Sequence, residues 1–359
     1  MPPSSSRRCF LFKPDGIGDF FIASGAVRLL AREFGEENLI LAVLPVMEPV
    51  VNAQFPRASV ISLPLRTRRK VLNLFVANCL RCFRPWVKLL KTNVDVSISL
   101  RYMRDYLQNV LFSSVPSTRR FTCSNLLLGN GRPVRRWTER VFIWIFGTQI
   151  IDYPDSEPGV PTELAAHRLV LSSALGREVD IREIWPELRA HSSPPLRIPY
   201  WVCAPFSSSP EKDFPLDRLR NLLLGLGEQG ELGTLVLTGS GDQRDSLEQF
   251  LASFSEASEE LGITAQIIIS EDLQKFIDLL AGAKCVVTMD TAAAHAATAL
   301  DCRTLVLFSG KHQGMFAPWI RSGRQQWLMP KSGLPPDHWH QSHTDEEILG
   351  MALALNASS

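Results

Sequence analysis

The sequence predicts an α/β protein built from two doubly wound domains, and three observations lead to this fold class. Short apolar, β-branched segments alternate with segments of helical periodicity along most of the chain, as in parallel sheets covered by helices. The alternation stops at a polar, proline-rich stretch, residues 191–199, and then starts again. The length of 359 residues exceeds that of one ordinary domain, so two domains are expected.

The first half is predicted to begin with a buried strand, a turn-rich loop at residues 13–19 and a helix. The pattern becomes unclear from about residue 112 to residue 185. The predicted strands are residues 9–12, 39–44, 60–63 and 94–100, and the predicted helices are residues 20–34, 71–90 and 102–111.

The second half repeats the alternation from residue 200 onward. Its predicted strands are residues 200–204, 234–238, 267–270, 285–289 and 304–308, and its predicted helices are residues 216–226, 246–254, 273–280 and 292–300. We therefore expect a Rossmann-like domain at 1–190, a second at 191–343, and a C-terminal helix and tail at 344–359. The two domains are expected to face each other across a cleft, with ligands at the carboxyl ends of the strands.

The composition is that of a globular protein in a reducing compartment. Hydrophobic residues make up 45% and charged residues 21% of the chain, and no stretch approaches the ~20 apolar residues of a spanning helix. The N-terminus lacks the apolar core and cleavage site of a secretory signal. Seven scattered cysteines argue against a disulfide framework, so we expect a cytoplasmic protein.

A net charge of +1 hides a strongly basic segment. Residues 57–140 carry 17 Lys and Arg but only three Asp and Glu. Such asymmetry points to a polyanionic partner, which could be an anionic glycolipid or membrane surface. The segment has no zinc-finger, RRM or helix-turn-helix signature, so we expect no nucleic acid partner. A solvated surface is the alternative for any single arginine.

The stretch VVTMDTAAAHAATALD, residues 286–301, predicts a strand that runs into a helix of small residues. Asp290 and Thr291 suit the start of this helix, where free backbone N–H groups favour an anion. His295 lies one turn after the start of this predicted helix. A structural histidine is the usual explanation for such a residue, but the preceding Asp-Thr pair favours a binding role.

Two loops after predicted strands carry candidate site residues. In the first loop, Gly16 and Gly18 would let a substrate approach while Asp19 acts as a carboxylate base. A dinucleotide fingerprint is disfavoured because Phe21 occupies the third glycine position. In the second loop, serine hydroxyls precede Lys212, and these groups suit a diphosphate. The alternatives are a tight turn for the first loop and a surface lysine for the second.

Two further clusters could be metal sites, but we favour structural explanations for both. Cys79 and Cys82 form a CxxC pair, yet no second pair or nearby histidine completes a zinc site, so two thiols on a helix are expected. His338, His340 and His343 lie in proline-rich surroundings, which indicate a surface loop.

Three motifs resemble those of glycosyltransferase family 9, the ADP-heptose:lipopolysaccharide heptosyltransferases. They are KPDGIGD at residues 13–19, the Ser207-Ser208 and Lys212–Pro215 loop, and LLAGAKCVVTMDTAAAH at residues 279–295. The resemblance extends over about 85% of the chain and is weakest between residues 66 and 185. It implies a GT-B fold and inverting transfer of a sugar from a nucleotide donor, ADP-heptose first, without an essential metal or other cofactor.

The resemblance also implies roles for individual residues. Asp19 would be the general base, and the basic N-terminal domain would bind an acceptor such as a lipid A–core glycolipid. The implied donor-binding residues are Ser207, Ser208, Lys212, Asp242, Asp290, Thr291, Ala292 and His295. The implied acceptor-binding residues are Gly16, Gly18, Arg101, Arg104, Arg119 and Arg120. The acceptor would bring the protein to the cytoplasmic face of the inner membrane.

The sequence departs from the family pattern at Ala292, where glycine is usual, and at Phe214, where tryptophan is usual. The Cβ of Ala292 takes space near the donor. These departures leave open two alternatives. One is a GT-B binding protein without catalysis, and the other is a transferase that uses another nucleotide sugar on a protein or capsule acceptor.

Overall fold

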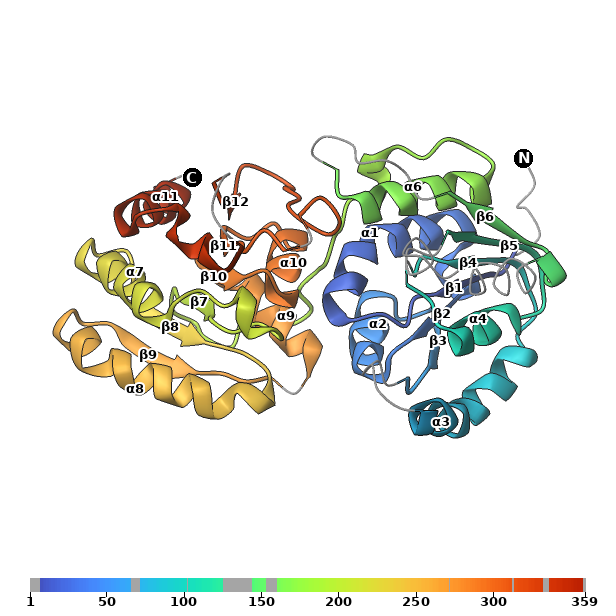
Figure 1. The fold of residues 1–359 in the computed structure, drawn as a ribbon, viewed down its shortest axis with the longest axis horizontal. Coiled ribbons are helices and arrows are strands. Elements are labelled where there is room, and N and C mark those ends of the chain that lie inside the picture. Colours follow the sequence, from blue (N-terminus) through green and yellow to red (C-terminus); the bar gives the residue numbers. More distant parts are fainter. Residues whose placement is uncertain are drawn as a thin grey trace. The chain divides into compact units, whose positions relative to one another are not determined.

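The computed structural model of the protein describes residues 7–65, 72–101, 103–124, 144–152, 160–270, 272–311, 313–331 and 336–357. The chain divides into two compact units (Figure 1). Unit 1 contains the residues up to Trp185 together with Gly314–Phe316, and unit 2 contains the remainder. Across the residues just given, no helix is long and apolar enough to cross a membrane.

Unit 1 contains a six-stranded, all-parallel sheet. Its strands are β1 (Cys9–Phe12), β2 (Leu39–Val43), β3 (Ser59–Ser62), β4 (Val94–Ser99), β5 (Ser117–Cys123) and β6 (Thr148–Ile151). They are arranged in the doubly wound order β3-β2-β1-β4-β5-β6. Strands β2 and β3 are added on one side of β1, and β4, β5 and β6 are added on the other. We call the position between β1 and β4, where the direction of addition changes, the reversal point of the sheet. Its described helices are α1 (Ile17–Phe34), α2 (Glu48–Gln54), α3 (Leu72–Leu90), α4 (Tyr106–Ser113) and α6 (Thr162–Leu175).

Unit 2 repeats this topology. Its strands are β7 (Trp201–Ala204), β8 (Thr234–Leu237), β9 (Thr264–Ile267), β10 (Cys285–Met289), β11 (Thr304–Leu307) and β12 (Gln325–Leu328). The order β12-β11-β10-β7-β8-β9 again reverses at the first strand, here between β7 and β10. The helices are α7 (Leu216–Glu228), α8 (Arg244–Glu260), α9 (Leu273–Ala281), α10 (Ala292–Ala299) and α11 (Asp345–Ala357). The predicted fold class is confirmed.

Helices cover both faces of each sheet, because parallel strands joined by crossover helices must bury both sides. In unit 1, α1 and α6 lie on one face, and α3 and α4 on the other (Figure 1). Phe10 and Phe12 of β1 point toward α3 and α4 and share a cluster with Cys82 and Leu111. In unit 2, α7, α8 and α11 pack on the large apolar cluster of the sheet.

Several element boundaries differ from the predictions. Helix α1 begins at Ile17, so Gly18 and Asp19 lie in its first turn and not in a loop, with Gly16 as the extended N-cap residue. The predicted strand at 267–270 was placed three residues late, since β9 is Thr264–Ile267. Strands β5, β6 and β12 and helices α2 and α6 had no predicted counterpart. The predicted division into 1–190, 191–343 and 344–359 stays a prediction.

Candidate functional site

The reversal point of the unit 1 sheet gathers charged side chains from the loops after β1 and β4. These strands are neighbours, with Phe12 paired to Ser99, so the residues that follow them emerge side by side. Lys13 and Asp15 follow β1, and Arg101 follows β4. Ligands of doubly wound sheets bind at this position, outside the carboxyl ends of the strands.

Lys13 is the centre of a buried ionic network. Its ammonium lies 2.8 Å from Asp15 Oδ2 and 2.7 Å from Glu163 Oε1, and it donates to Leu100 O at 3.1 Å. Lys13 is wholly buried and Asp15 nearly so. Burial opposes the charge on Lys13, but the carboxylates of Asp15, Glu163 and Asp19 outweigh it and raise the pKa of this lysine. Asp15 also pairs with the Arg101 guanidinium.

Glu163 and His167 of α6 complete the network, and neither was predicted from the sequence. The Nε2 atom of His167 lies 3.2 Å from Leu100 O and 3.4 Å from Glu163 Oε1. Burial lowers the pKa of His167, so the ring stays neutral and Nε2 carries the proton. Burial favours the neutral acid at Glu163, but Lys13 and the hydrogen bond from His167 outweigh it and lower the pKa of this carboxyl. The i, i+4 spacing of Glu163 and His167 was the available signal.

Asp19 occupies the first turn of α1 beside this network. Burial raises its pKa to about 8, and the negative charges of Glu163 and Asp15 act in the same direction, against Lys13 and Arg101. The positive end of α1 favours the ionised form, so the raised value reflects burial and the neighbouring carboxylates. Such a carboxyl group can accept a proton near neutral pH. The role of Asp19 as a general base stays a prediction.

Arg101 and Arg104 organise the loop after β4. Arg101 donates to Pro14 O at 2.7 Å as well as pairing with Asp15. Arg104 is only 3% exposed and donates to Arg101 O at 2.7 Å and to Cys123 O at 2.8 Å. These contacts give both arginines structural roles. Acceptor binding by them stays a prediction.

Arg119 and Arg120, which the resemblance implies as acceptor-binding residues, lie inside β5 and not in a loop after a strand. The guanidinium of Arg120 donates to Phe146 O at 2.9 Å and also to Val115 O. Both acceptors precede their strands, so this side chain reaches toward the amino ends of the sheet, away from Asp19. The structure therefore does not bring Arg120 to the network around Lys13.

The reversal point of unit 2 brings Lys212 and Asp290 together, 78 residues apart in the chain. Lys212 follows β7, Asp290 follows β10, and these strands are paired. Their side chains form an ion pair, with Nζ 2.8 Å from Asp290 Oδ2. Both are largely buried, at 18% and 7% side-chain exposure. Lys212 is therefore not a freely exposed lysine, and donor binding by it stays a prediction.

Helix α10 begins immediately after Asp290. Thr291 is its N-cap residue, and its hydroxyl accepts from Ala293 N at 3.1 Å. Ala292 is the first helical residue and is partly exposed. His295 is buried, and its Nδ1 accepts a hydrogen bond from Trp319 Nε1 at 3.1 Å. The partial positive charge of the helix end suits an anion at Thr291 and Ala292. Donor binding by these residues and by His295 stays a prediction.

The serine loop after β7 is shaped by its own hydrogen bonds. Ser207 N donates to Asp213 Oδ1 at 2.6 Å, and Ser207 Oγ donates to Ser209 O at 2.6 Å. Ser208 is exposed. Gln243 Nε2 donates to Ser207 O at 3.1 Å and ties this loop to the one after β8, where Asp242 is exposed. The candidate donor-binding residues thus come from the carboxyl ends of three neighbouring strands.

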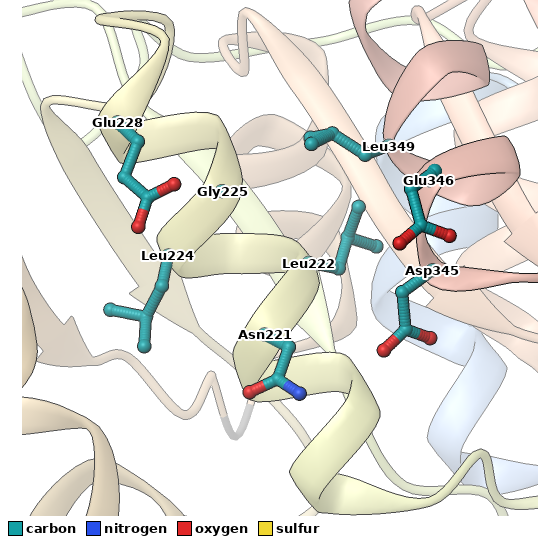
Figure 2. A pocket seen from close by; sticks show the side chains of 8 residues that line it. All are labelled: Asn221, Leu222, Leu224, Gly225, Glu228, Asp345, Glu346 and Leu349. Atoms are coloured by element: carbon teal, nitrogen blue, oxygen red, sulfur yellow. The ribbon is translucent and has the colours of Figure 1, made fainter.

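A pocket of about 290 Å³ lies elsewhere in unit 2, between α7 and α11 (Figure 2). Figure 2 shows Leu222 and Leu349 between the two helices, with Glu228 on α7 and Asp345 and Glu346 on α11. No lysine or arginine lines this pocket. Three carboxylates would repel a diphosphate, so the pocket does not compete with Lys212 as a donor site.

The two candidate metal clusters have other contacts. Cys79 and Cys82 are free thiols, and Cys82 belongs to the apolar core beneath α3. His343 Nε2 lies 2.8 Å from Met329 O. The described part of the chain contains no group of three His, Cys, Asp or Glu residues arranged to hold a metal.

These observations define a class of protein. Two units with the same doubly wound strand order are the architecture of the GT-B fold. The model of glycosyltransferase family 9 (heptosyltransferase) matches residues 136–338, more than half of the chain. The chain therefore belongs to glycosyltransferase family 9 and is a glycosyltransferase. No curated protein matches it.

Solved structures share the fold along nearly the whole chain. The E. coli ADP-heptose LPS heptosyltransferase II is 16% identical, with a TM-score of 0.68, and the match covers 97% of this chain and 98% of that one. A family 9 glycosyl transferase from Veillonella parvula is 10% identical, with a TM-score of 0.70 and coverage of 99% and 98%. E. coli heptosyltransferase WaaC with ADP is 15% identical, with a TM-score of 0.69 and coverage of 98% and 100%. At such identities the likeness establishes the fold alone.

Proposed function

We propose that the protein transfers a sugar from a nucleoside diphosphate donor to a hydroxyl group of an anionic glycan, with inversion at the anomeric carbon. The observation that carries this proposal is the position of Asp19, in the first turn of α1 at the reversal point of unit 1, where burial and the carboxylates of Glu163 and Asp15 raise its pKa to about 8. A group that accepts a proton near neutral pH is what activation of a hydroxyl nucleophile requires.

In the proposed reaction, the acceptor oxygen attacks the anomeric carbon while Asp19 removes its proton. The bond between that carbon and the diphosphate oxygen breaks, and the electron pair leaves with the diphosphate. Gly16 and Gly18 would let the acceptor approach Asp19. No metal or other cofactor is assigned a step in this mechanism.

Unit 2 would hold the donor. Lys212 would exchange part of its ion pair with Asp290 for the diphosphate, and the amides at the start of α10 would face the leaving charge. Preorganised donors of this kind are typically worth roughly 3 kcal/mol each. Asp290 would then be free to accept hydrogen bonds from the donor sugar. Ser207, Ser208 and Asp242 would contact the phosphates and ribose, and Ala292 would limit the space near the donor.

The donor we propose is ADP-heptose, and the acceptor is a lipopolysaccharide core or a related glycan. Two of the similar solved proteins are described as heptosyltransferases, and one of these structures contains ADP. An anionic acceptor agrees with the basic residues 57–140. Such an acceptor would place the protein in the cytoplasm, in peripheral contact with the inner membrane.

A panel of nucleotide sugars tests this proposal. We would measure the thermal stabilisation of the purified protein by each sugar together with release of nucleoside diphosphate. A ligand at one hundred times its Kd adds about 2.7 kcal/mol of stability, so the expected result is a clear shift with ADP-heptose and slow release of ADP. Stabilisation without release in the presence of acceptor would indicate a binding protein. Stabilisation by a different nucleotide sugar would reassign the donor.

A further inference from the structure

Helix α3 has a buried side and an exposed side, and its rotation is fixed by packing. Cys82 and Leu89 are buried in the core of unit 1. Trp86 packs against the same core, and its Nε1 donates to Ser114 Oγ at 2.7 Å. The residues on the opposite side of the helix must therefore face outward. Figure 1 shows α3 at the periphery of unit 1.

The outward side carries large apolar residues where a globular helix normally carries polar ones. Leu80 is 74% exposed, Phe83 is 58% exposed and Leu90 is 48% exposed. Phe83 follows Leu80 by three residues, and Leu90 follows Phe83 by seven, with the half-buried Val87 between these last two. This spacing places the side chains in one stripe along the helix. A contiguous exposed apolar stripe of this kind marks an interaction surface.

Basic residues lie along one edge of this stripe. Arg81, Arg84, Lys88 and Lys91 are all exposed, and residues 72–91 contain no Asp or Glu. At 100° per residue, Arg84 lies directly beside Leu80, and Arg81 and Lys88 lie further around the same side. Lys91 follows the last residue of α3. Lys88 also donates to Val60 O at 3.1 Å, which keeps its stem against the surface of unit 1.

We infer that this surface of α3 binds the headgroup region of an anionic lipid bilayer. Leucine and phenylalanine beside lysine and arginine, without acidic residues, is the pattern of a helix that lies in the plane of a membrane surface. The apolar side chains would enter the acyl boundary and the cations would contact lipid phosphates. Residues 72–91 contain no acidic side chain. This absence favours an anionic membrane surface over a protein partner, because a protein surface would present charges of both signs. This inference assigns residues to the membrane contact proposed above.

Vesicle sedimentation with the full chain tests this inference. Vesicles of phosphatidylcholine would be compared with vesicles that contain phosphatidylglycerol as well. One variant combines Leu80→Glu with Phe83→Glu, and another combines Arg81→Glu with Arg84→Glu. Ile320→Glu in unit 2 is the matched control, because Ile320 is also an exposed apolar residue, at 50% exposure. All four α3 positions are exposed, so these variants should fold normally.

We expect binding to the anionic vesicles to be at least about tenfold tighter than to the neutral ones, and to weaken as salt is raised. Each double variant should lose at least about tenfold in binding, while the control binds like the wild type. Failure of the wild type to bind anionic vesicles would overturn the inference, as would unchanged binding of both α3 variants. If the α3 variants instead abolished a dimer seen by light scattering, the occupant would be a second copy of the chain. Turnover on a lipid-free acceptor tests the transferase proposal separately, so the two can fail independently.

Discussion

At the scale of single residues, the surroundings of Asp19 determine what its carboxyl group can do. Gly16 leaves room for it, because a Cβ atom at position 16 would lie 3.3 Å from Asp19 Oδ2. Glu163 and Asp15 oppose its ionisation, while Lys13 and Arg101 limit the effect. The pKa of Asp19 therefore depends on residues drawn from three segments of the chain.

The pH dependence of turnover tests the state of Asp19. With a pKa of about 8, roughly 3% of the molecules carry an ionised Asp19 at pH 6.5. Because the ionised form is the base, kcat/KM should rise about tenfold per pH unit below pH 8 and level off above it. A flat profile between pH 6 and pH 8.5 would contradict this assignment.

The variant Glu163→Gln removes the negative charge of this side chain and keeps its shape nearly unchanged. Removal of this negative charge should lower the pKa of Asp19, so the rising limb of the profile should move to lower pH. The measurement is the same pH profile, with Glu178→Gln on the surface of unit 1 as the control. A purely structural role of Glu163 would lower the rate at every pH without moving the limb.

Lys212→Ala tests the donor site. Loss of a charge-assisted hydrogen bond to a phosphate costs about 1.5–3 kcal/mol, so the affinity for ADP should fall by about 10- to 100-fold. Titration calorimetry with ADP measures this directly. Lys275→Ala is the control, because Lys275 is an exposed lysine of the same unit. Equal affinities for the two variants would remove Lys212 from the donor site.

The sequence identified some of these residues and missed others for a physical reason. Asp19, Lys212 and Asp290 follow predicted strands, so the edge at which they emerge could be predicted. The pairing of Lys212 with Asp290, and the approach of Glu163 and His167 to Lys13, join residues 78 and about 150 positions apart. Local periodicity contains no information about contacts over such distances.

At the scale of elements, close approach between segments explains where small residues are needed. A Cβ atom at Gly25 of α1 would lie 2.2 Å from Ile184 O and 2.3 Å from Trp185 O. Helix α1 therefore packs directly on the backbone of the segment that ends unit 1. In contrast, nothing lies within 4 Å of a Cβ atom at Gly350 of α11.

The same substitution at these two helical glycines should have opposite effects. Gly25→Ala should destabilise the protein by about 1–3 kcal/mol, because the methyl group overlaps backbone oxygens that cannot rotate away. Gly350→Ala should stabilise it by about 0.5–1 kcal/mol, because alanine favours the helix and meets nothing. Unfolding in denaturant measures both free energies. Similar values for the two variants would show that α1 does not pack as described.

Two strands that the sequence did not predict share a cause. Strand β5 reads STRRFTC and carries two arginines, and its place in the sheet depends on pairing with β4 and β6. Strand β12 is likewise short and polar at its start and is held by β11. Edge and near-edge strands of this kind are specified by their neighbours and not by their own periodicity.

At the scale of the whole molecule, both units use one topology. Each places its first strand at the reversal point, so each presents the loop after that strand to a ligand. This arrangement could be predicted because the alternation of strands and helices is a local signal that is repeated along the chain. Under the proposed function, the two chemical tasks would fall to separate units, the base to unit 1 and the diphosphate site to unit 2.

The variant Asp19→Asn tests this division of tasks most directly. The substitution keeps the shape of the side chain and removes the base, so turnover with donor and acceptor should fall at least about a hundredfold. Thermal stabilisation by ADP should be unchanged, because the proposed diphosphate site lies in unit 2. Turnover that remains within a few-fold of the wild type would contradict the account, since the proton would then leave by another route.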